Sequence, residues 1–216
     1  SYASILDRLT KDAVRMQIPI GEEEKHEGVV DLLTMRACYF EGNMGNVLRW
    51  AEIPENLKAD AAKYRAELVE KIAAEDDTLM TEYLEGKELS IEQLKPVLRR
   101  AVIANKIVPV FTGSALKNKG AQLVLDGVVD YLPSPLDIPP TKGIDVTTGE
   151  PTVSLASDDE PFAALAFNVQ TDPFIGQLTF FRVYSGMLES GSYVYNATTE
   201  EKERVSRIVR MHSIER

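Results

Sequence analysis

Apolar residues recur along the chain with two different spacings, and each spacing predicts a local structure. Residues 14–20 alternate between apolar and polar positions, which is typical of a half-buried strand. In residues 57–72 the apolar positions are three or four residues apart, so they lie on one stripe of a helix. The same criteria predict further strands at 28–33, 35–40 and 107–112, and further helices at 78–84, 91–101 and 121–132.

The predicted helices carry signals for their ends and for their buried faces. Ser90 and Gln93 have the spacing of a capping box, which favours a helix start there. Pro96 conflicts with that start, because it removes one helical hydrogen bond and crowds the preceding turn. Two interpretations stay open: the helix kinks at Pro96, or it begins later than the capping box indicates. The helix at 121–132 is expected to bury a stripe formed by Ala121, Leu125, Val128 and Leu132.

The character of the sequence changes after residue 132. The stretch PSPLDIPP ends the last helix and a polar connector follows, which places a domain boundary within residues 133–160. From residue 161 onward, short β-type runs alternate with turn segments, as in an antiparallel sheet or barrel. The predicted fold class is an α/β region with a helical insert, followed by an incomplete antiparallel β-barrel. The aromatic residues expected in the barrel core are Phe174, Phe180 and Tyr184.

Charge narrows the classes of function. The chain of 216 residues has a net charge of −10, which argues against nucleic-acid binding through bulk electrostatics. From Glu52 to Glu92 there are twelve Asp and Glu residues against five Lys and Arg residues. This excess is either a solvated helical face or an acidic docking surface for a basic protein, and both interpretations stay open.

Other features of the composition argue against several kinds of site. Cys38 is the only cysteine, so no internal disulfide is possible, which suits a reducing cytosol. His26 and His212 are far apart and have no Cys or His neighbours at ligand spacing, so no metal site is predicted. No apolar run reaches the ~20 residues needed to span a bilayer. We therefore expect a soluble, cytoplasmic protein that makes no membrane contact.

One short loop is the main candidate for chemistry. The sequence GSALKNKG, residues 113–120, connects a predicted strand to a predicted helix, a place where α/β proteins bind nucleotides with free backbone N–H groups. The same arrangement joins any ordinary strand–helix unit, so the octapeptide alone leaves both interpretations open. Lys117 and Lys119 are expected to be solvated. The chain contains neither GxxxxGK[ST] nor Asn-Lys-x-Asp, so it lacks a phosphate cradle and no catalytic residue is predicted.

Several phrases of the sequence resemble bacterial-type translation elongation factor G, a translational GTPase, and they occur in that family's order. They are IGEEEKHEGVVDLLTMRACYF, the segment from EIPENL to TEYLEG, GSALKNKG, VVDYLPSPLDIPP and TDPFIGQLTFFRVYSGMLESG. The resemblance implies an internal fragment of such a factor. It implies that residues 1–133 are the C-terminal part of the GTP-binding domain with an α+β insert at about 21–106, that 134–160 are a linker, and that 161–216 begin the β-barrel second domain.

The resemblance also assigns a role to the loop. The N–H of Ala115 would bind O6 of guanine, Ser114 would shape the loop, and Leu116 would complete the guanine-binding set. A base edge must come within ~3 Å of that N–H, which suits small residues. The parent protein would bind GTP or GDP with Mg²⁺ and hydrolyse GTP. The fragment alone is expected to have no GTPase activity and no tightly bound nucleotide, because the phosphate cradle is missing.

The resemblance implies the ribosome as partner. The acidic insert helices would meet the ribosomal stalk protein, and the barrel would face ribosomal RNA, with Arg204, Arg207 and Arg210 as candidates. Residues 207 and 210 would lie on opposite faces of a regular strand, which argues against a continuous basic stripe. Three hypotheses remain. The chain is a fragment of a translocation factor, whose parent uses GTP hydrolysis to move tRNA and mRNA. Alternatively it is a fragment of a tetracycline-resistance ribosomal-protection protein, or a ribosome-binding adaptor that is not a GTPase.

Overall fold

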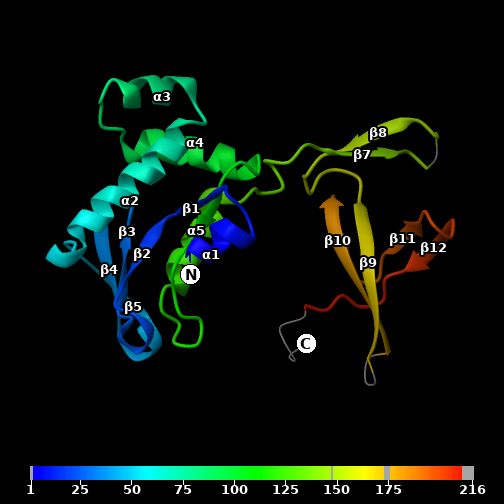
Figure 1. Cartoon of the computed structure of the whole chain (residues 1–216). Helices are drawn as coiled ribbons and strands as arrows, with labels where there is room; N and C mark the ends of the chain where they lie inside the picture. Colours follow the sequence, from blue (N-terminus) through cyan, green and yellow to red (C-terminus); the bar gives the residue numbers. More distant parts are fainter. Residues whose placement is uncertain (1, 147, 173–175, 211–216) are drawn as a thin grey trace. The chain divides into compact units, whose positions relative to one another are not determined.

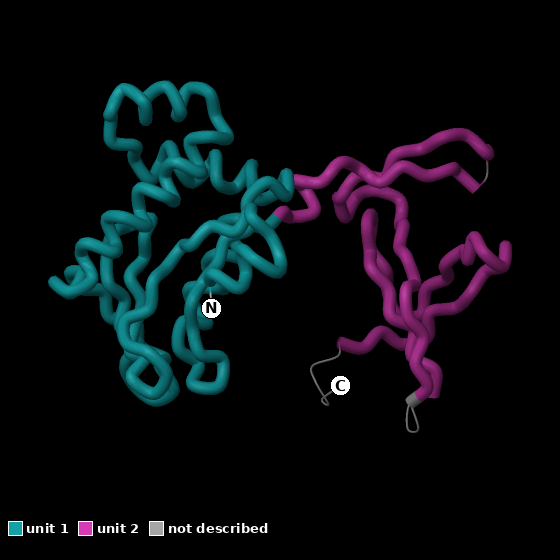
Figure 2. Tube along the Cα trace, viewed as in Figure 1, with its two compact units in different colours: residues 1–132 teal, residues 133–216 magenta. Residues whose placement is uncertain are grey.

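The computed structural model describes residues 2–146, 148–172 and 176–210. The chain divides into two compact units, Ser1–Leu132 and Pro133–Arg216, which we call unit 1 and unit 2 (Figure 2). Phe174, His212 and the end of the last predicted strand lie outside the described residues.

Unit 1 combines a parallel pair of strands with a four-stranded antiparallel sheet and several helices (Figure 1). The parallel pair is β1 with β6, and the antiparallel sheet has the order β2-β3-β4-β5. The elements of unit 1, in chain order, are α1 (Tyr2–Arg8), β1 (Ala13–Arg15), β2 (Gln17–Ile20), β3 (Gly28–Asp31), β4 (Arg36–Glu41), β5 (Val47–Ala51), α2 (Glu55–Ala73), α3 (Asp77–Leu84), α4 (Ile91–Ile103), β6 (Val108–Val110) and α5 (Ala121–Tyr131), with short 3-10 turns at Glu23–Lys25 and Asn43–Gly45.

The predicted strand 14–20 is divided between the two sheets at Met16. The N–H of Met16 donates to the carbonyl of Val110 at 3.0 Å, and its own carbonyl accepts from the N–H of Leu32 at 3.0 Å. Met16 lies in neither strand, but its backbone is shared between β6 on one side and the residue that follows β3 on the other. The predicted burial of the apolar positions is confirmed for Val14, Met16, Ile18 and Ile20. The alternation is broken at Gln17, which is also buried.

Within unit 1, β5 was not predicted. Val47, Arg49 and Trp50 are exposed at the edge of the sheet, so burial does not impose an alternating pattern on this segment. Cross-strand contacts hold it against β4 instead. The guanidinium of Arg49 lies 2.5 Å from the carboxylate of Glu41 and 4.5 Å from the ring centroid of Tyr39.

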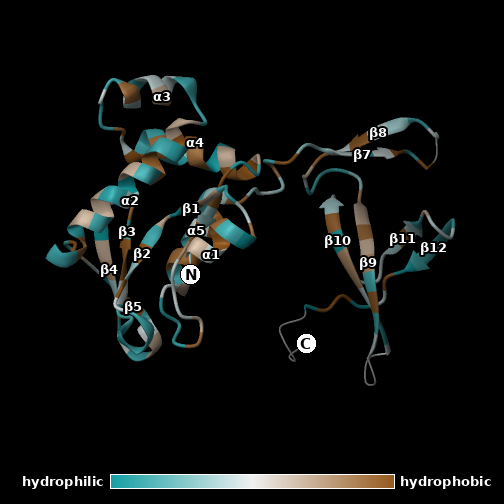
Figure 3. Cartoon of the chain, in the orientation of Figure 1, coloured by the Kyte–Doolittle hydropathy of each residue, from teal (hydrophilic) through white to brown (hydrophobic). Residues whose placement is uncertain are grey.

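The three helices predicted between β5 and β6 along the chain, α2, α3 and α4, are confirmed. In Figure 3 both α2 and α4 show hydrophilic and hydrophobic residues side by side, as amphipathic helices do. The capping box forms at the start of α4: the N–H of Gln93 donates to Oγ of Ser90 at 3.3 Å, and the N–H of Ser90 donates to Oε1 of Gln93 at 3.0 Å. Pro96 therefore lies inside the helix, and the later start is wrong. The largest fully buried residues of the three helices are Leu68, Ile72, Leu94 and Leu98.

The buried face predicted for α5 is wrong. The residues that α5 buries are Leu123, Gly127 and Tyr131, whereas Leu125 is 64% exposed. The reason is a close approach at Gly127, where a Cβ atom would lie 2.5 Å from the ring of Phe111. Only glycine allows this approach, so the helix turns that face inward. A set of apolar residues is left exposed on α5, comprising Val124, Leu125, Val128, Val129 and Leu132.

In the described part of unit 2 the strands form three antiparallel pairs, β7-β8, β9-β10 and β11-β12. Their bounds are β7 (Thr141–Ile144), β8 (Pro151–Ser154), β9 (Ala163–Asp172), β10 (Gly176–Ser185), β11 (Tyr193–Asn196) and β12 (Glu201–Arg204). The antiparallel pairing is thus confirmed, whereas the incomplete barrel stays a prediction. Phe180 and Tyr184, predicted as core, are half-buried.

Two predicted segments of unit 2 differ from the structure. Residues 134–160, expected to be a linker, contain the β7-β8 hairpin, because Asp145 organises its turn. The N–H of Asp145 donates to the carbonyl of Glu150, and the carbonyl of Asp145 accepts from the N–H of Gly149. The carboxylate of Asp145 accepts from the N–H of Thr148. At the other end, β12 stops at Arg204, and residues 205–210 are not a strand. The predicted alternation of Arg207 and Arg210 across a strand is therefore wrong.

The core of unit 1 gives a direct test of the packing. We expect Leu98→Ala to lower the free energy of unfolding by about 2–5 kcal/mol, because Leu98 is completely buried and its truncation leaves a cavity. The matched control is Leu84→Ala, because Leu84 is 75% exposed, and its effect should stay within about 0.5 kcal/mol. Urea denaturation measures both variants. Equal effects would contradict the described core.

Candidate functional site

The loop 113–120 is a closed turn at the end of β6. The N–H of Ser114 donates to the carbonyl of Lys119 at 2.8 Å, and the N–H of Lys119 donates back to the carbonyl of Ser114 at 3.0 Å. Glycine is needed at both ends. A Cβ on Gly113 would lie 2.6 Å from the carbonyl of Lys119, and Gly120 has a φ of +85°. The pattern G-x₆-G therefore follows from the tightness of the turn.

The three residues predicted to read guanine lie together at the tip of this loop. Ala115 and Leu116 are exposed, the latter to 88%, and Ser114 is half-buried. The N–H of Ala115 donates no hydrogen bond to any described residue, whereas the carbonyl of Ala115 accepts from the N–H of Asn118 at 3.1 Å. The loop thus presents a backbone donor to the surroundings, which is the chemistry needed to bind an acceptor on a base edge.

An open cleft adjoins the root of the loop. It has a volume of about 930 Å³ and is lined by residues near the carboxyl ends of both parallel strands, among them Gln17 after β1 and Thr112 after β6. Ligands of open α/β sheets bind outside the carboxyl ends of the strands. Arg15 also lines the cleft, and its guanidinium lies 4.2 Å from the ring of Tyr2 and 3.8 Å from the ring of Tyr64. Stacking on these rings fixes the guanidinium in place.

Three side chains connect the loop region to the antiparallel sheet, and sequence reasoning missed all three. The N–H of Thr112 donates to Oε1 of Gln17 at 3.2 Å. Nζ of Lys119 donates to the carbonyl of His26 at 2.5 Å, and Nε2 of Gln122 donates to the carbonyl of Gly45 at 3.3 Å. Lys119 was expected to be solvated, and that prediction is wrong. Lys117 is exposed as predicted.

His26 lies at this junction in an unfavourable position for a positive charge. Desolvation lowers the pKa of its imidazole, and the ammonium groups of Lys119 and then Lys117 lower it further, while a hydrogen bond with the backbone of Gly21 opposes the shift. Its ring is 5.9 Å from that of Phe40. Nε2 of His26 and Oε1 of Gln122 are buried and have no hydrogen-bond partner among the described residues.

The remaining titratable candidates are not arranged as a reactive site. Burial raises the pKa of the Cys38 thiol to about 11, so the thiol stays protonated near neutral pH. Within the described ranges, no three His, Cys, Asp or Glu side chains are grouped so that they could hold a metal ion. In the same ranges, no helix is both long and apolar enough to cross a bilayer.

The acidic helices use some of their carboxylates internally. Asp76 caps α3 and lies 2.7 Å from the guanidinium of Arg100, and Glu75 lies 2.8 Å from the ammonium of Lys106. Glu67 and Glu70 on α2 are exposed. Glu75 and Asp76 are thus neutralised within the fold, whereas the acidic surface of α2 is a row of exposed carboxylates that also includes Glu55 and Asp60.

Comparison with known proteins relates unit 2 to translation factors. A family model described as elongation factor Tu domain 2 matches residues 176–216. The chain is also similar to a crystal structure of a protein from Thermus thermophilus, designated ttk003000868, with a TM-score of 0.70 and 26% sequence identity. The similarity covers 95% of this chain but only 28% of that protein. The family match therefore concerns residues 176–216 alone, whereas the structural similarity extends over nearly all of this chain.

The electrostatics of His26 lead to a prediction about pH. The pKa of His26 in the folded chain lies below the ordinary value near 6.5, so the unfolded chain binds more protons as the pH falls below about 6.5. His26 should therefore leave stability unchanged above that pH and reduce it progressively from there down to its folded pKa. We expect His26→Gln to lose less stability than the wild-type chain between pH 7 and pH 5. Parallel pH profiles of the two chains in urea denaturation would contradict this account.

Proposed function

We propose that this chain is an internal piece of a translational GTPase of the elongation factor G type. Unit 1 would be the C-terminal part of its GTP-binding domain with an insert, and unit 2 would begin its second domain. The parent protein would hydrolyse GTP to drive the movement of tRNA and mRNA on the ribosome, in the cytoplasm. The observation that carries the proposal is the combination of two features: a strand–loop–helix unit with an exposed Ser-Ala-Leu turn, followed by a match to elongation factor Tu domain 2.

The geometry of the loop supports guanine as its ligand. The N–H of Ala115 has no partner among the described residues, and the closed turn holds it at an exposed tip. A guanine O6 would accept from this donor, whereas adenine would present an amino group and leave two donors facing each other. Phosphates and Mg²⁺ would be bound by other parts of the parent protein, so this chain alone would hold GTP or GDP weakly.

The uncovered apolar surface of unit 1 supports a larger GTP-binding domain. Sheets made of parallel strands normally have both faces covered, yet the parallel sheet here consists of β1 and β6 alone. In addition, α5 exposes Leu125 to 64% and Val129 to 77%. We propose that further strands and helices of the parent domain cover this surface. The likeness to a Thermus protein of which this chain spans 28% supports the same arrangement.

The guanine assignment gives a test in the full-length parent protein. Ala115→Pro removes the proposed donor, so the affinity for GDP should fall by about 1–3 kcal/mol, which is roughly five- to two-hundred-fold. The matched control is Ala115→Gly, which keeps the N–H and should bind GDP nearly as well as the wild-type protein. Inosine diphosphate, which shares O6, should show the same loss. Calorimetry measures all three proteins. Unchanged GDP affinity in a folded Ala115→Pro protein would refute the assignment.

The proposed partner of the acidic surface is the ribosomal stalk protein, with ribosomal RNA facing unit 2. We expect the double reversal Glu67→Lys and Glu70→Lys to slow association of the parent protein with ribosomes at low salt, because exposed charges mainly affect the association rate. The double reversal Asp158→Lys and Asp159→Lys in unit 2 makes the same change in net charge and serves as the control, because added positive charge near RNA should not slow association. Stopped-flow binding measures the rates. An equal loss on ribosomes that lack the stalk protein would exclude stalk docking.

A further inference from the structure

The root of the loop 113–120 is attached to the first strand of the antiparallel sheet, β2. Gln17 is only 2% exposed, which is unusual because glutamine side chains mostly lie at the surface of proteins. Its Oε1 accepts from the N–H of Thr112, the residue that precedes the loop. Gln17 opens β2, directly after the residue shared between the two sheets. The first residue of the antiparallel sheet therefore fixes the chain where it leaves β6.

Lys119 attaches the far side of the loop. Its backbone pairs with Ser114, and its ammonium donates to the carbonyl of His26, so one residue both closes the turn and connects it to the insert. The stem of Lys119 passes close to Gly45, where a Cβ atom would lie 3.1 Å from Cγ of the lysine. Because Ser114 directly precedes Ala115, a shift of Lys119 is transmitted through this pairing to the Ala115 N–H.

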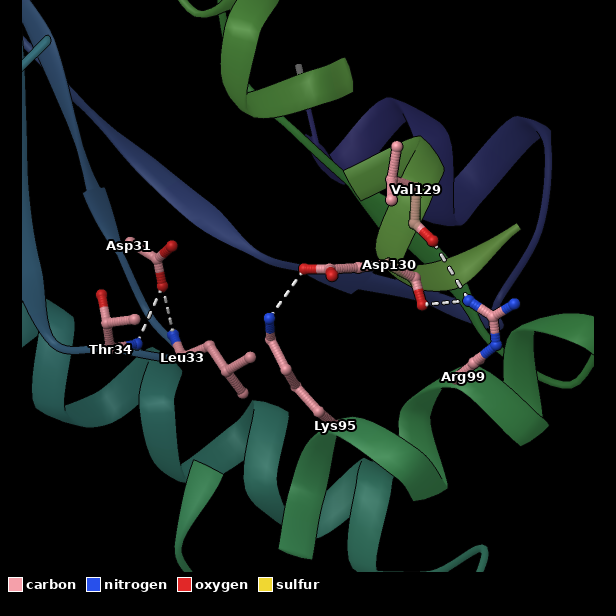
Figure 4. Close-up of polar contacts among 7 residues, drawn as sticks. All are labelled: Asp31, Leu33, Thr34, Lys95, Arg99, Val129 and Asp130. Carbon is pink, nitrogen blue, oxygen red and sulfur yellow. Dashed lines mark hydrogen bonds and ion pairs between the residues drawn. The ribbon is translucent and has the colours of Figure 1, made fainter. Parts of the chain in front are cut away.

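The helix that follows the loop is held by the insert at both ends. Near its start, Gln122 donates to the carbonyl of Gly45. At its end, Nζ of Lys95 lies 2.7 Å from the carboxylate of Asp130, and the guanidinium of Arg99 donates to the carbonyls of Val129 and Asp130 at 3.1 and 2.7 Å (Figure 4). A cation at the last carbonyls of a helix is favourable, so these contacts hold the C-terminal end of α5 in place.

We propose that the insert, residues 21–106, together with Gln17, is the platform that positions the base-reading loop, and that Gln17 and Lys119 are positioning residues for guanine recognition. The choice of guanine as the ligand rests on the proposed function, whereas the positioning of the loop by these contacts does not. Without these hydrogen bonds the loop would be held by its covalent connections to β6 and α5 and by packing against Gly45 and Phe40. With them, the Ala115 N–H keeps one direction before any nucleotide arrives, which lowers the cost of ordering on binding.

Amide hydrogen exchange of this chain, followed by NMR without nucleotide, tests the inference. We expect Lys119→Met to accelerate exchange at the N–H groups of Ser114 and Lys119 about tenfold, because the methionine keeps the stem but cannot donate. Lys119→Arg restores a donor and should return both rates to within about threefold of the wild-type values. The matched control is Lys117→Met, which changes an exposed lysine of the same loop and should alter the rates by less than about twofold.

The outcomes distinguish positioning of the loop by a hydrogen bond from an effect of side-chain packing alone. They also distinguish failure of this inference from failure of the proposed guanine recognition. Wild-type rates in Lys119→Met, or rates in Lys119→Arg as fast as those in Lys119→Met, would overturn the inference. If Lys119→Met does not fold, Gln122→Ala provides the same readout through the contact with Gly45, with an expected acceleration of about threefold; unchanged rates there would also overturn it. In the parent protein, Lys119→Met should weaken GDP binding and Lys119→Arg should restore it. A loosened loop with no effect on GDP affinity would leave the platform intact and refute guanine recognition.

Discussion

The shared residue Met16 is the constraint on which the rest of unit 1 depends. Its N–H is bonded to β6 and its carbonyl to the residue after β3, so the chain passes from a parallel sheet to an antiparallel one without a connecting loop. This fixes the place where the insert leaves the α/β region, and it puts Gln17 beside the root of the loop 113–120. The two sheets are therefore joined through the backbone, and the position of one determines the position of the other.

Packing and polar contacts have different roles around this junction. Fully buried side chains such as Ile72, Leu94 and Leu98 hold the helices of the insert together and supply most of the stabilising burial. The contacts between the insert and the loop are instead hydrogen bonds from Lys119 and Gln122 to backbone carbonyls. Such bonds contribute modestly to stability but are strongly directional, so they suit the placement of a binding loop more than the stabilisation of a core.

The sequence predicted elements with a regular apolar period and missed features that depend on tertiary contacts. The helices α2, α3 and α4 followed from their spacing and capping residues, and the turn at 113–120 followed from its glycines. The buried face of α5 could not be predicted, because it depends on the ring of Phe111 packing on Gly127. The strand β5 is an exposed edge strand with no alternation.

The candidate site likewise combines residues that a local motif indicates with contacts between residues far apart in the sequence. Ser114, Ala115 and Leu116 were proposed from a motif, and in the structure Ala115 and Leu116 are exposed while Ser114 is half-buried. The contacts made by Gln17 and Lys119 join residues 95 and 93 positions apart, so no local pattern could indicate them. The alternation in residues 14–20 predicted Gln17 on the exposed face, so its burial, and with it the need for a hydrogen-bond partner, appears only in the structure.

The central claim is that the loop 113–120 reads guanine through the N–H of Ala115, and a crystal structure of the parent protein with GDP tests it most directly. The account predicts a distance of about 2.7–3.2 Å between the nitrogen of Ala115 and O6 of guanine. It also predicts that the pairing of Ser114 with Lys119 is unchanged, because the turn is already closed before the nucleotide binds. A guanine bound beyond hydrogen-bonding distance of Ala115, or a loop rebuilt around the base, would contradict the account.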